Sequence, residues 1–332
     1  MKQHVVKKIL CVCMAATLCM GSLMGCGIGN TEVVWTSHLN GSTVFKIGDE
    51  SCKLSDAKVF LINYRNIYGK TFGIKAWKQS YNGQTMEEYV KQTTVSQLAK
   101  MKTMVLLAKE KNFKLSEKEE EAVVEAAKKY YDSLTWEDKE YLGATKSSVE
   151  DLYREMALAT KLYTNLTGGI NEEVSDDDAR VMQVEQIVLT DEDKAKSVEK
   201  KIEAGNDFSN LASIYNTASN TKVTLYKQKM GENTRKALTS LDDGEVSKCI
   251  EEDGKYYFYK VITKIDRQLT EENKEVIVKE RATKAFDEVY SNFKAKLSST
   301  YNHDMWDEFS IEEDNKATTS NFFEVFDETL DL

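Results

Sequence analysis

The chain has 332 residues with 41% hydrophobic and 10% aromatic side chains, which suits a folded protein of two domains and excludes an intrinsically disordered one. Its formal net charge of −10 becomes −13 without the first 25 residues, which carry three lysines and no acid. This charge disfavours nucleic acid and anionic lipid headgroups as partners. The sequence contains no proline, so no X-Pro bond slows its own folding and none interrupts its helices.

Residues 1–25 have the pattern of a bacterial secretion signal. Three lysines precede a mostly apolar run, Ile9 to Met24, that is too short for a comfortable membrane span. The run ends in Leu23-Met24-Gly25-Cys26, which resembles a lipobox. The resemblance implies cleavage before Cys26, a diacylglyceryl group on its thiol and a tether over residues 26–32. The alternative is an uncleaved signal anchor, and either would hold the protein at the extracytoplasmic face of the bacterial cell membrane.

Few cysteines remain in the mature part of the chain. Beyond Cys26 there are only Cys52 and Cys249, which fall in different predicted domains. We interpret both as buried small hydrophobic residues or free thiols rather than as a disulfide framework.

Residues 33–170 are predicted to form a helical domain with a hairpin at its start. The hairpin is expected between residues 33–35 and 44–47, around Asn40-Gly41. Helices follow, with starts at Ser55, at the capping boxes Thr85-x-x-Glu88 and Ser116-x-x-Glu119, and at Ser148.

Residues 180–266 are predicted to form a small α+β module. A strand over residues 181–189 precedes two helices, over 191–204 and 207–215. A strand over 224–230 and a helix over 233–241 come next. The module ends in two strands, 245–250 and 256–262, joined by Asp253-Gly254, which is a hairpin signal.

Three short runs in this module resemble a parvulin-type peptidyl-prolyl isomerase domain. They are Gly205-x-Asp-Phe-x-x-Leu-Ala212, Leu241-x-x-Gly-Glu-Val-Ser247 and the aromatic closing strand. With the lipobox, the chain is similar to the PrsA-type foldase lipoproteins. The resemblance implies an α+β fold, in which a mostly helical SurA-like body of N- and C-terminal parts carries an inserted module with a four-stranded antiparallel sheet and helices.

The C-terminal part is expected to contain a helix and a tail. The pattern predicts one long amphipathic helix within residues 267–301, and the resemblance implies that it packs on the N-terminal domain. Residues 302–332 hold ten carboxylates and one lysine, with scattered aromatic residues. We interpret them as a solvated acidic tail with a few docking aromatic residues. No calcium-loop motif is present, and no metal or cofactor is expected.

The resemblance also implies where a proline pocket would lie. The two histidine positions of the family correspond to Gln186 and Tyr257, and the Met and Phe of the pocket correspond to Met230 and Thr234. We expect Gln186 and Tyr257 to form a polar pair in the core. Tyr226, with Tyr256 and Tyr259, is a further candidate contact for an extended peptide, although alternate tyrosines on a strand more often pack. Substitutions that fall on the pocket while the packing residues stay indicate a binding module.

Two functions from different classes follow. The first is a lipid-anchored chaperone or foldase that binds unfolded or exported polypeptides, as a monomer or homodimer. The second is an active peptidyl-prolyl isomerase with a site that lacks histidine. A ligand-binding lipoprotein for a transporter is a weaker alternative, because the chain shows no repeated lobes of strands and helices.

Overall fold

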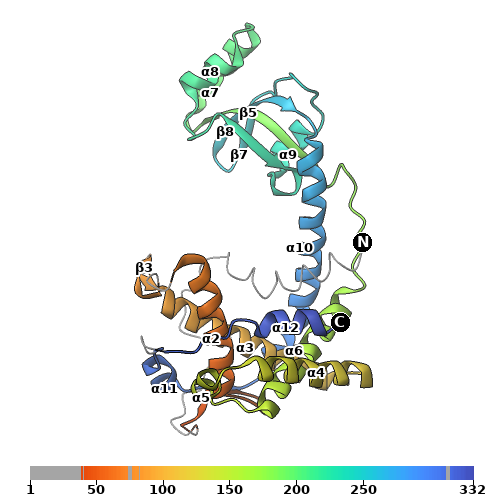
Figure 1. Ribbon diagram of the computed structural model, residues 1–332. Coiled ribbons are helices and arrows are strands. Elements are labelled where there is room, and N and C mark those ends of the chain that lie inside the picture. The colour runs from red at the N-terminus through yellow and green to blue at the C-terminus, as the bar shows by residue number, and fades with distance from the viewer. Residues whose placement is uncertain (1–38, 40, 74–76, 82, 312–314) are drawn as a thin grey trace. The chain divides into compact units, whose positions relative to one another are not determined.

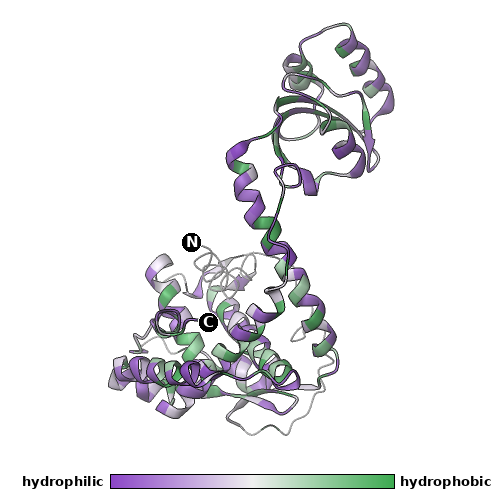
Figure 2. Cartoon of the chain, turned by 90° about the vertical axis from the view of Figure 1, so that its right-hand side faces the viewer, coloured by the Kyte–Doolittle hydropathy of each residue, from purple (hydrophilic) through white to green (hydrophobic). Residues whose placement is uncertain are grey.

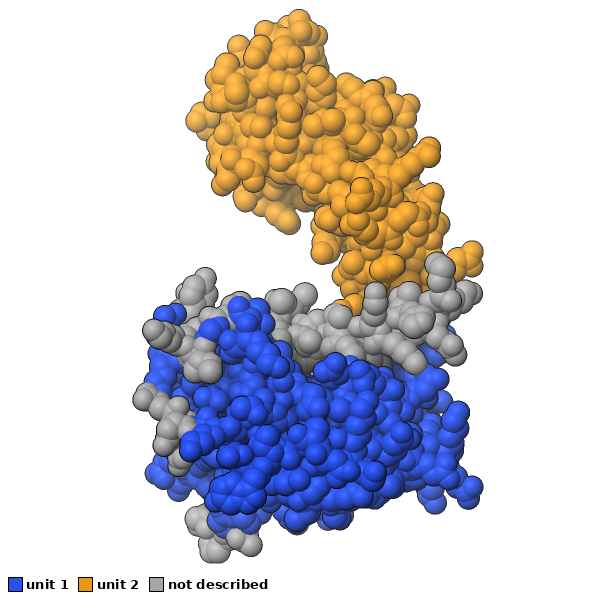
Figure 3. Space-filling view, in the orientation of Figure 1, with its two compact units in different colours: residues 1–169, 284–332 blue, residues 170–283 orange. Residues whose placement is uncertain are grey.

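The computed structural model describes residues 39, 41–73, 77–81, 83–311 and 315–332. The predicted signal peptide, Cys26, the tether and the first strand of the predicted hairpin lie outside them. The chain divides into two compact units (Figure 3): unit 1 comprises residues 1–169 and 284–332, and unit 2 comprises 170–283. Mixed helices and antiparallel sheets confirm the predicted α+β class. We find no helix in the described ranges with the length and hydrophobicity of a membrane span.

Unit 1 is built mainly from helices (Figure 1). Those before unit 2 are α2 (Leu54–Phe72), α3 (Met86–Glu110), α4 (Glu117–Ser133), α5 (Trp136–Leu142) and α6 (Lys146–Thr167). The two predicted capping boxes are confirmed at the starts of α3 and α4, where hydroxyl and carboxylate each satisfy a backbone N–H. Two expected starts are wrong. Ser55 lies inside α2, which begins after Lys53, and α6 begins after Thr145, whose hydroxyl accepts the Ser148 N–H.

Two small sheets complete this part of unit 1. The order of the larger one is β2-β1-β9, from β1 (Thr43–Ile47), β2 (Glu50–Lys53) and β9 (Ser299–Tyr301). The other pairs β3 (Ser80–Tyr81) with β4 (Gln84–Thr85). The described hairpin is therefore β1–β2, one turn later than predicted. It turns through Gly48, whose positive φ of 52° favours glycine.

The C-terminal part of unit 1 corrects two predictions. Helix α10 (Arg267–Lys294) ends before Tyr301, which lies in β9. The predicted solvated tail instead forms α11 (His303–Glu308) and α12 (Phe322–Thr329), and it buries Trp306, Phe322 and Phe326 in the unit 1 core. The prediction relied on the high proportion of carboxylates in this segment and gave too little weight to its aromatic residues. Burying each such ring contributes about 1.5–3 kcal/mol, which favours a packed segment.

Unit 2 is organised around a sheet of order β6-β5-β8-β7, antiparallel throughout. This confirms the predicted four-stranded sheet, whose strands are lined by apolar residues (Figure 2). Its elements in chain order are β5 (Val181–Leu189), α7 (Glu192–Glu203), α8 (Phe208–Tyr215), β6 (Lys222–Tyr226), the 3₁₀ turn η3 (Lys227–Lys229), α9 (Glu232–Leu238), β7 (Ile250–Glu252) and β8 (Lys255–Thr263). Helices α7 and α8 pack with one face of the sheet, and α9 packs with the other.

At the end of the sheet, one prediction is confirmed and one is wrong. Asp253 and Gly254 both have positive φ, 50° and 70°, and join β7 to β8 as the hairpin signal predicts. The strand predicted over residues 245–250 reaches only one isolated bridge, at Val246, before β7 begins. The Ser247 hydroxyl accepts the Tyr259 N–H at 3.0 Å, so a side chain replaces a backbone acceptor and interrupts the ladder.

Candidate functional site

The candidate site lies where α9 covers one face of the sheet, and we call it the α9 face. It comprises Gln186, Tyr257 and Tyr259 on the strands, with Met230 and Thr234 at the start of α9. In the β5–β8 ladder, Gln186 lies opposite Tyr259, and Val188 lies opposite Tyr257. Directly opposed residues share a face, as do residues two apart on one strand. The two positions that the resemblance assigns to histidine are therefore diagonal neighbours on one face.

Gln186 supports a neighbouring loop. Its side-chain Nε2 donates to the Asn220 carbonyl at 2.9 Å, and its backbone N–H donates to the Thr221 carbonyl at 2.7 Å. The side chain is half-buried. The predicted polar pair of Gln186 and Tyr257 in the core is therefore wrong, because the Gln186 amide is bonded to a carbonyl of the loop before β6.

Thr234 is hydrogen-bonded inside the module. Its side chain is buried, and its hydroxyl donates to Glu252 Oε2 at 2.5 Å. The other carboxylate oxygen of Glu252 accepts the Asn233 N–H at 3.0 Å. A carboxylate at this position also favours the start of α9, where backbone N–H groups are free.

The Glu252 carboxylate also sets a steric limit at Gly231. A Cβ placed on Gly231 would lie 2.0 Å from Glu252 Cδ, closer than real Cβ atoms come to any group. Gly231 has an ordinary φ of −60°, so the backbone does not require glycine there, and a larger residue would have to displace the end of the Glu252 side chain. The Glu252 carboxylate therefore lies against Gly231 and is also hydrogen-bonded to Thr234.

Tyr259 lies on the sheet face that α9 covers. Its ring is buried, and burial raises the pKa of Tyr259. Tyr257 stacks on it with ring centroids 5.9 Å apart and planes 6° apart. Tyr257 itself is half-buried, and its pKa is raised by burial and by the nearby Asp253 and Glu252 carboxylates.

Met230 lies where the resemblance places it. It is buried and packs in one apolar cluster with Met182, Leu238 and Val261. Met230 and Thr234 flank the start of α9, so the structure brings together Met230, Thr234 and Tyr257, three of the four predicted contact residues.

The fourth, Tyr226, is separated from them. It lies opposite Val181 in the β5–β6 ladder, whereas its neighbour Leu225 belongs to the α9 cluster. Its ring instead faces the Lys229 ammonium, 5.4 Å from the ring centroid. Tyr256 lies on the α7–α8 side with Cys249. Tyr226 and Tyr256 thus do not share a groove with Tyr257.

Sequence reasoning missed the contributions of Glu252 and Gly231. Thr234 and Glu252 are 18 residues apart on different elements. The only local signal is the short β7–β8 hairpin, which fixes Glu252 just before the turn, and that signal does not indicate a partner on α9.

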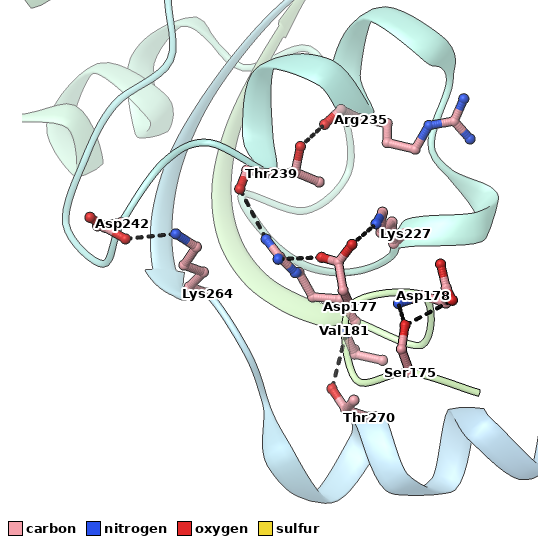
Figure 4. Close-up of polar contacts among 11 residues, drawn as sticks. Ser175, Asp177, Asp178, Val181, Lys227, Arg235, Thr239, Asp242, Lys264 and Thr270 are labelled. Carbon is pink, nitrogen blue, oxygen red and sulfur yellow. Dashed lines mark hydrogen bonds and ion pairs between the residues drawn. The ribbon is translucent and has the colours of Figure 1, made fainter. Parts of the chain in front are cut away.

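A second polar cluster lies where the chain passes into and out of the module (Figure 4). Asp177 accepts from Lys227 at 2.5 Å and pairs with Arg180, whose guanidinium also donates to the Thr239 carbonyl at 3.0 Å. The hydrogen bond from Lys227 lowers the pKa of Asp177 most strongly. Each charge has a partner, so we interpret the cluster as structural.

The remaining groups offer little for metal or thiol chemistry. Among the residues that the structure describes, no three His, Cys, Asp or Glu side chains are placed to hold a metal ion. Cys52 and Cys249 are free thiols in different units, and burial raises the pKa of each. The α9 face thus presents the stacked rings of Tyr257 and Tyr259 and a buried Thr234 hydroxyl bonded to the Glu252 carboxylate.

Comparisons with known proteins place the module in a family. The family model described as the PPIC-type PPIASE domain matches residues 171–276. A comparison with curated protein sequences finds no match. The family assignment thus concerns the module, which is about a third of the chain.

Several solved structures are similar to the whole chain. The peptidylprolyl isomerase PrsA of Bacillus cereus is 18% identical, with 83% of this chain and 95% of that chain covered and a TM-score of 0.40. PrsA of Bacillus subtilis is 22% identical, with 70% and 88% covered and a TM-score of 0.25. A SurA-like chaperone structure from Campylobacter jejuni is 12% identical, with 79% and 99% covered and a TM-score of 0.31. With these scores below 0.5, the family model carries the assignment.

Proposed function

We propose that this chain, whose residues 171–276 are a PPIC-type peptidyl-prolyl isomerase domain, is a chaperone that binds unfolded exported polypeptides and has little or no isomerase activity. The observation that carries the proposal is the hydrogen bond from the buried Thr234 hydroxyl to the Glu252 carboxylate. It occupies the place where the resemblance puts the phenylalanine of the proline pocket.

The chemistry of isomerisation explains why this matters. Rotation about an X-Pro bond crosses a barrier of about 18–20 kcal/mol, and catalysis requires a site that favours the twisted amide over the planar one. An apolar slot for the proline ring supplies part of that preference. In this chain the Thr234 hydroxyl, bonded to the Glu252 carboxylate, replaces part of that apolar slot. The fold of the module, which we propose binds polypeptides, is retained.

The sequence supports a location outside the cytoplasm. The Leu23-Met24-Gly25-Cys26 run follows a short apolar segment, and acylation of Cys26 would anchor the chain with about 0.8 kcal/mol for each buried CH₂ group. The acidic character of the mature chain gives no electrostatic attraction to anionic lipid, so we assign anchoring to the acyl chains. The mass of the anchored protein in solution distinguishes a monomer from a homodimer.

Two assays on the same preparation test the proposal. Light scattering follows the aggregation of a reduced, unfolded model protein, and a protease-coupled assay follows turnover of an X-Pro peptide. We expect suppression of aggregation that survives Met230→Ala, with no proline turnover above the uncatalysed rate. Turnover that Met230→Ala lowers, without suppression of aggregation, would contradict the proposal.

One observation favours the second candidate, an isomerase without histidine. Tyr257 and Gln186 share the α9 face as diagonal neighbours, and a bound amide would compete there with the Asn220 carbonyl for the Gln186 amide. If these groups act on a bound amide, proline turnover falls in Tyr257→Phe and in Gln186→Leu. Tyr256→Phe, on the other face of the sheet, is the matched control.

A further inference from the structure

The C-terminal segment, residues 315–332, is held in unit 1 in the way that a protein holds a bound peptide. Residues 315–321 form neither helix nor strand, and α12 follows them. Side chains of α2, α4, α5 and α6 contact this segment, more than 140 residues away in sequence. Its backbone N–H and C=O groups form hydrogen bonds with polar side chains and do not pair with a β-strand.

The extended part is gripped by two side chains. Asn66 on α2 donates from Nδ2 to the carbonyls of Ala317 and Thr319, at 3.1 and 2.8 Å. Asp138 on α5 accepts at Oδ1 the N–H groups of Thr318 and Thr319, at 2.7 and 3.1 Å. These bonds recognise a main chain and therefore do not depend on the side chains of the bound segment.

Phe322 is the anchor of the segment. Its N–H donates to Asn63 Oδ1 at 3.1 Å, and its carbonyl accepts from the Tyr153 hydroxyl at 2.8 Å. Its ring is fully buried and stacks on Tyr153 with centroids 4.5 Å apart. The slot is thus shaped for one large aromatic side chain between two backbone contacts.

The receiving groups are buried and polar. Asn63 and Tyr153 are 0% exposed and Asp138 is 2% exposed. A core that merely covers a terminal helix needs only apolar side chains, whereas buried polar groups are costly without partners. Backbone groups of the C-terminal segment are the partners of Asn63 Oδ1, Asp138 Oδ1 and the Tyr153 hydroxyl, and backbone contacts of this kind give peptide-binding grooves affinity.

The outer contacts of the segment are weaker. Lys129 pairs with Glu328 at 2.6 Å, and both side chains are about half exposed. Lys70 donates to the Ser320 hydroxyl at the surface. Exposed pairs of this kind contribute at most about 1 kcal/mol, so most of the binding comes from the backbone contacts and the buried side chains, with Phe322 beside Val325, Phe326 and Leu330.

We propose that α2, α4, α5 and α6 form a peptide-binding groove that the C-terminal segment occupies as a tethered ligand, and that a client polypeptide segment with an extended stretch and a large aromatic residue competes for it. The client part of this inference builds on the proposed chaperone function. A tether gives its ligand an effective concentration in the millimolar range, so the segment restricts the groove to abundant or tightly bound clients.

Cutting the tether in the folded full chain tests the groove. A protease recognition sequence is inserted between the half-buried Asn315 and the exposed Lys316, and the purified protein is cut. We expect cut protein to take up a fluorescein-labelled synthetic peptide of residues 316–332, measured by anisotropy, while uncut protein takes up none. A peptide with Phe322→Ala should bind roughly tenfold more weakly or worse, because it lacks the central aromatic anchor. A peptide with Glu324→Ala, an exposed position, should bind within about twofold of the parent peptide.

An uncut variant guards against loss of the fold. Phe322→Ala in the full chain weakens the tethered ligand without removing it, so this variant should take up the wild-type labelled peptide. Failure of both the cut protein and this variant to bind the peptide would overturn the inference. Loss of helical circular dichroism together with release of the fragment would overturn it as well, because the segment would then be an inseparable part of the core.

Light scattering with an unfolded model protein tests the client assignment. Cut protein freed of its fragment should suppress aggregation at a severalfold lower concentration than uncut protein, and added peptide should reverse the gain. Peptide uptake without any such gain would overturn the client assignment. If neither form suppresses aggregation, the proposed function fails while anisotropy still decides whether the groove exists.

Discussion

The hydroxyl of Thr234 on α9 donates to the carboxylate of Glu252 on β7 across 2.5 Å, at the position where the resemblance to parvulins places an aromatic pocket residue. The same carboxylate accepts the Asn233 N–H and lies against Gly231. The contact thus joins the start of α9 to the edge of the sheet and fills part of the predicted pocket with polar groups.

Removing the Thr234 hydroxyl should destabilise unit 2. Thr234→Val keeps the shape of the side chain but leaves the Glu252 carboxylate without one hydrogen-bond partner. We expect a loss of about 1–3 kcal/mol in the free energy of unfolding, measured with urea. Thr224→Val, on a more exposed part of β6, is the control and should change stability by less than about 0.5 kcal/mol. Equal effects of the two substitutions would contradict the assigned role of Thr234.

Gly231→Ala should be destabilising for a steric reason that a second substitution relieves. The new Cβ would overlap the end of the Glu252 side chain, which must then move away from Thr234 and Asn233, and losing these hydrogen bonds costs about 1–3 kcal/mol. In the double variant with Glu252→Ala, Gly231→Ala should cost much less. Gly169→Ala, where a Cβ meets nothing within 4 Å, is the control. Additive effects of the two substitutions would rule out the overlap.

A buried ion pair in unit 1 should make stability depend on pH. Lys102 Nζ lies 2.6 Å from Glu155 Oε1, close to Asp56, Cys52 and Glu50. Burial raises the pKa of Glu155 to about 7 from an ordinary 4.5, against the opposing effect of Lys102. The folded state therefore holds this proton more tightly than the unfolded state.

The sign of this pH dependence follows from the raised pKa. The contribution of Glu155 to stability is fully present below pH 4.5 and is lost as the pH rises through about 7. We expect Glu155→Gln to flatten the corresponding part of a plot of unfolding free energy against pH. Glu150→Gln, on the outer side of α6, should leave the slope unchanged. An unaltered slope in Glu155→Gln would exclude Glu155 as its source.

At the base of the module, burial should matter more than charge. Thr270 is 2% exposed and its hydroxyl accepts the Val181 N–H at 3.2 Å, whereas the Asp177 side chain is 57% exposed (Figure 4). Thr270→Val should cost about 1–3 kcal/mol because it leaves a buried N–H unpaired. Asp177→Asn should cost less than about 1 kcal/mol. The reverse order in urea unfolding would refute this comparison.

Local signals in the sequence predicted much of unit 2 and two of the four expected helix starts of unit 1. The capping boxes at Thr85 and Ser116 and the Asp253-Gly254 hairpin depend on residues within four positions of one another, so neighbouring residues decide them. The strand-like runs over residues 181–189 and 256–262 likewise predicted β5 and β8, although not that these two strands pair.

Features that depend on distant contacts escaped prediction. The interruption at Ser247 depends on Tyr259, twelve residues away, and the burial of Phe322 depends on Asn63, 259 residues away. The separation of Tyr226 from Tyr257 depends on the register of two strands, which neither strand sets alone. For the same reason the sequence placed Thr234 in a pocket but could not identify Glu252 as its partner.

The most direct test of the central claim is the rate of cis–trans exchange of an X-Pro peptide, measured by exchange NMR with purified protein at a concentration that suppresses client aggregation. Uncatalysed exchange takes tens to hundreds of seconds, so catalysis is readily seen. Our account predicts an exchange rate equal to that of the peptide alone. A faster rate that Met230→Ala or Tyr257→Phe abolishes would show that the α9 face is a working isomerase site.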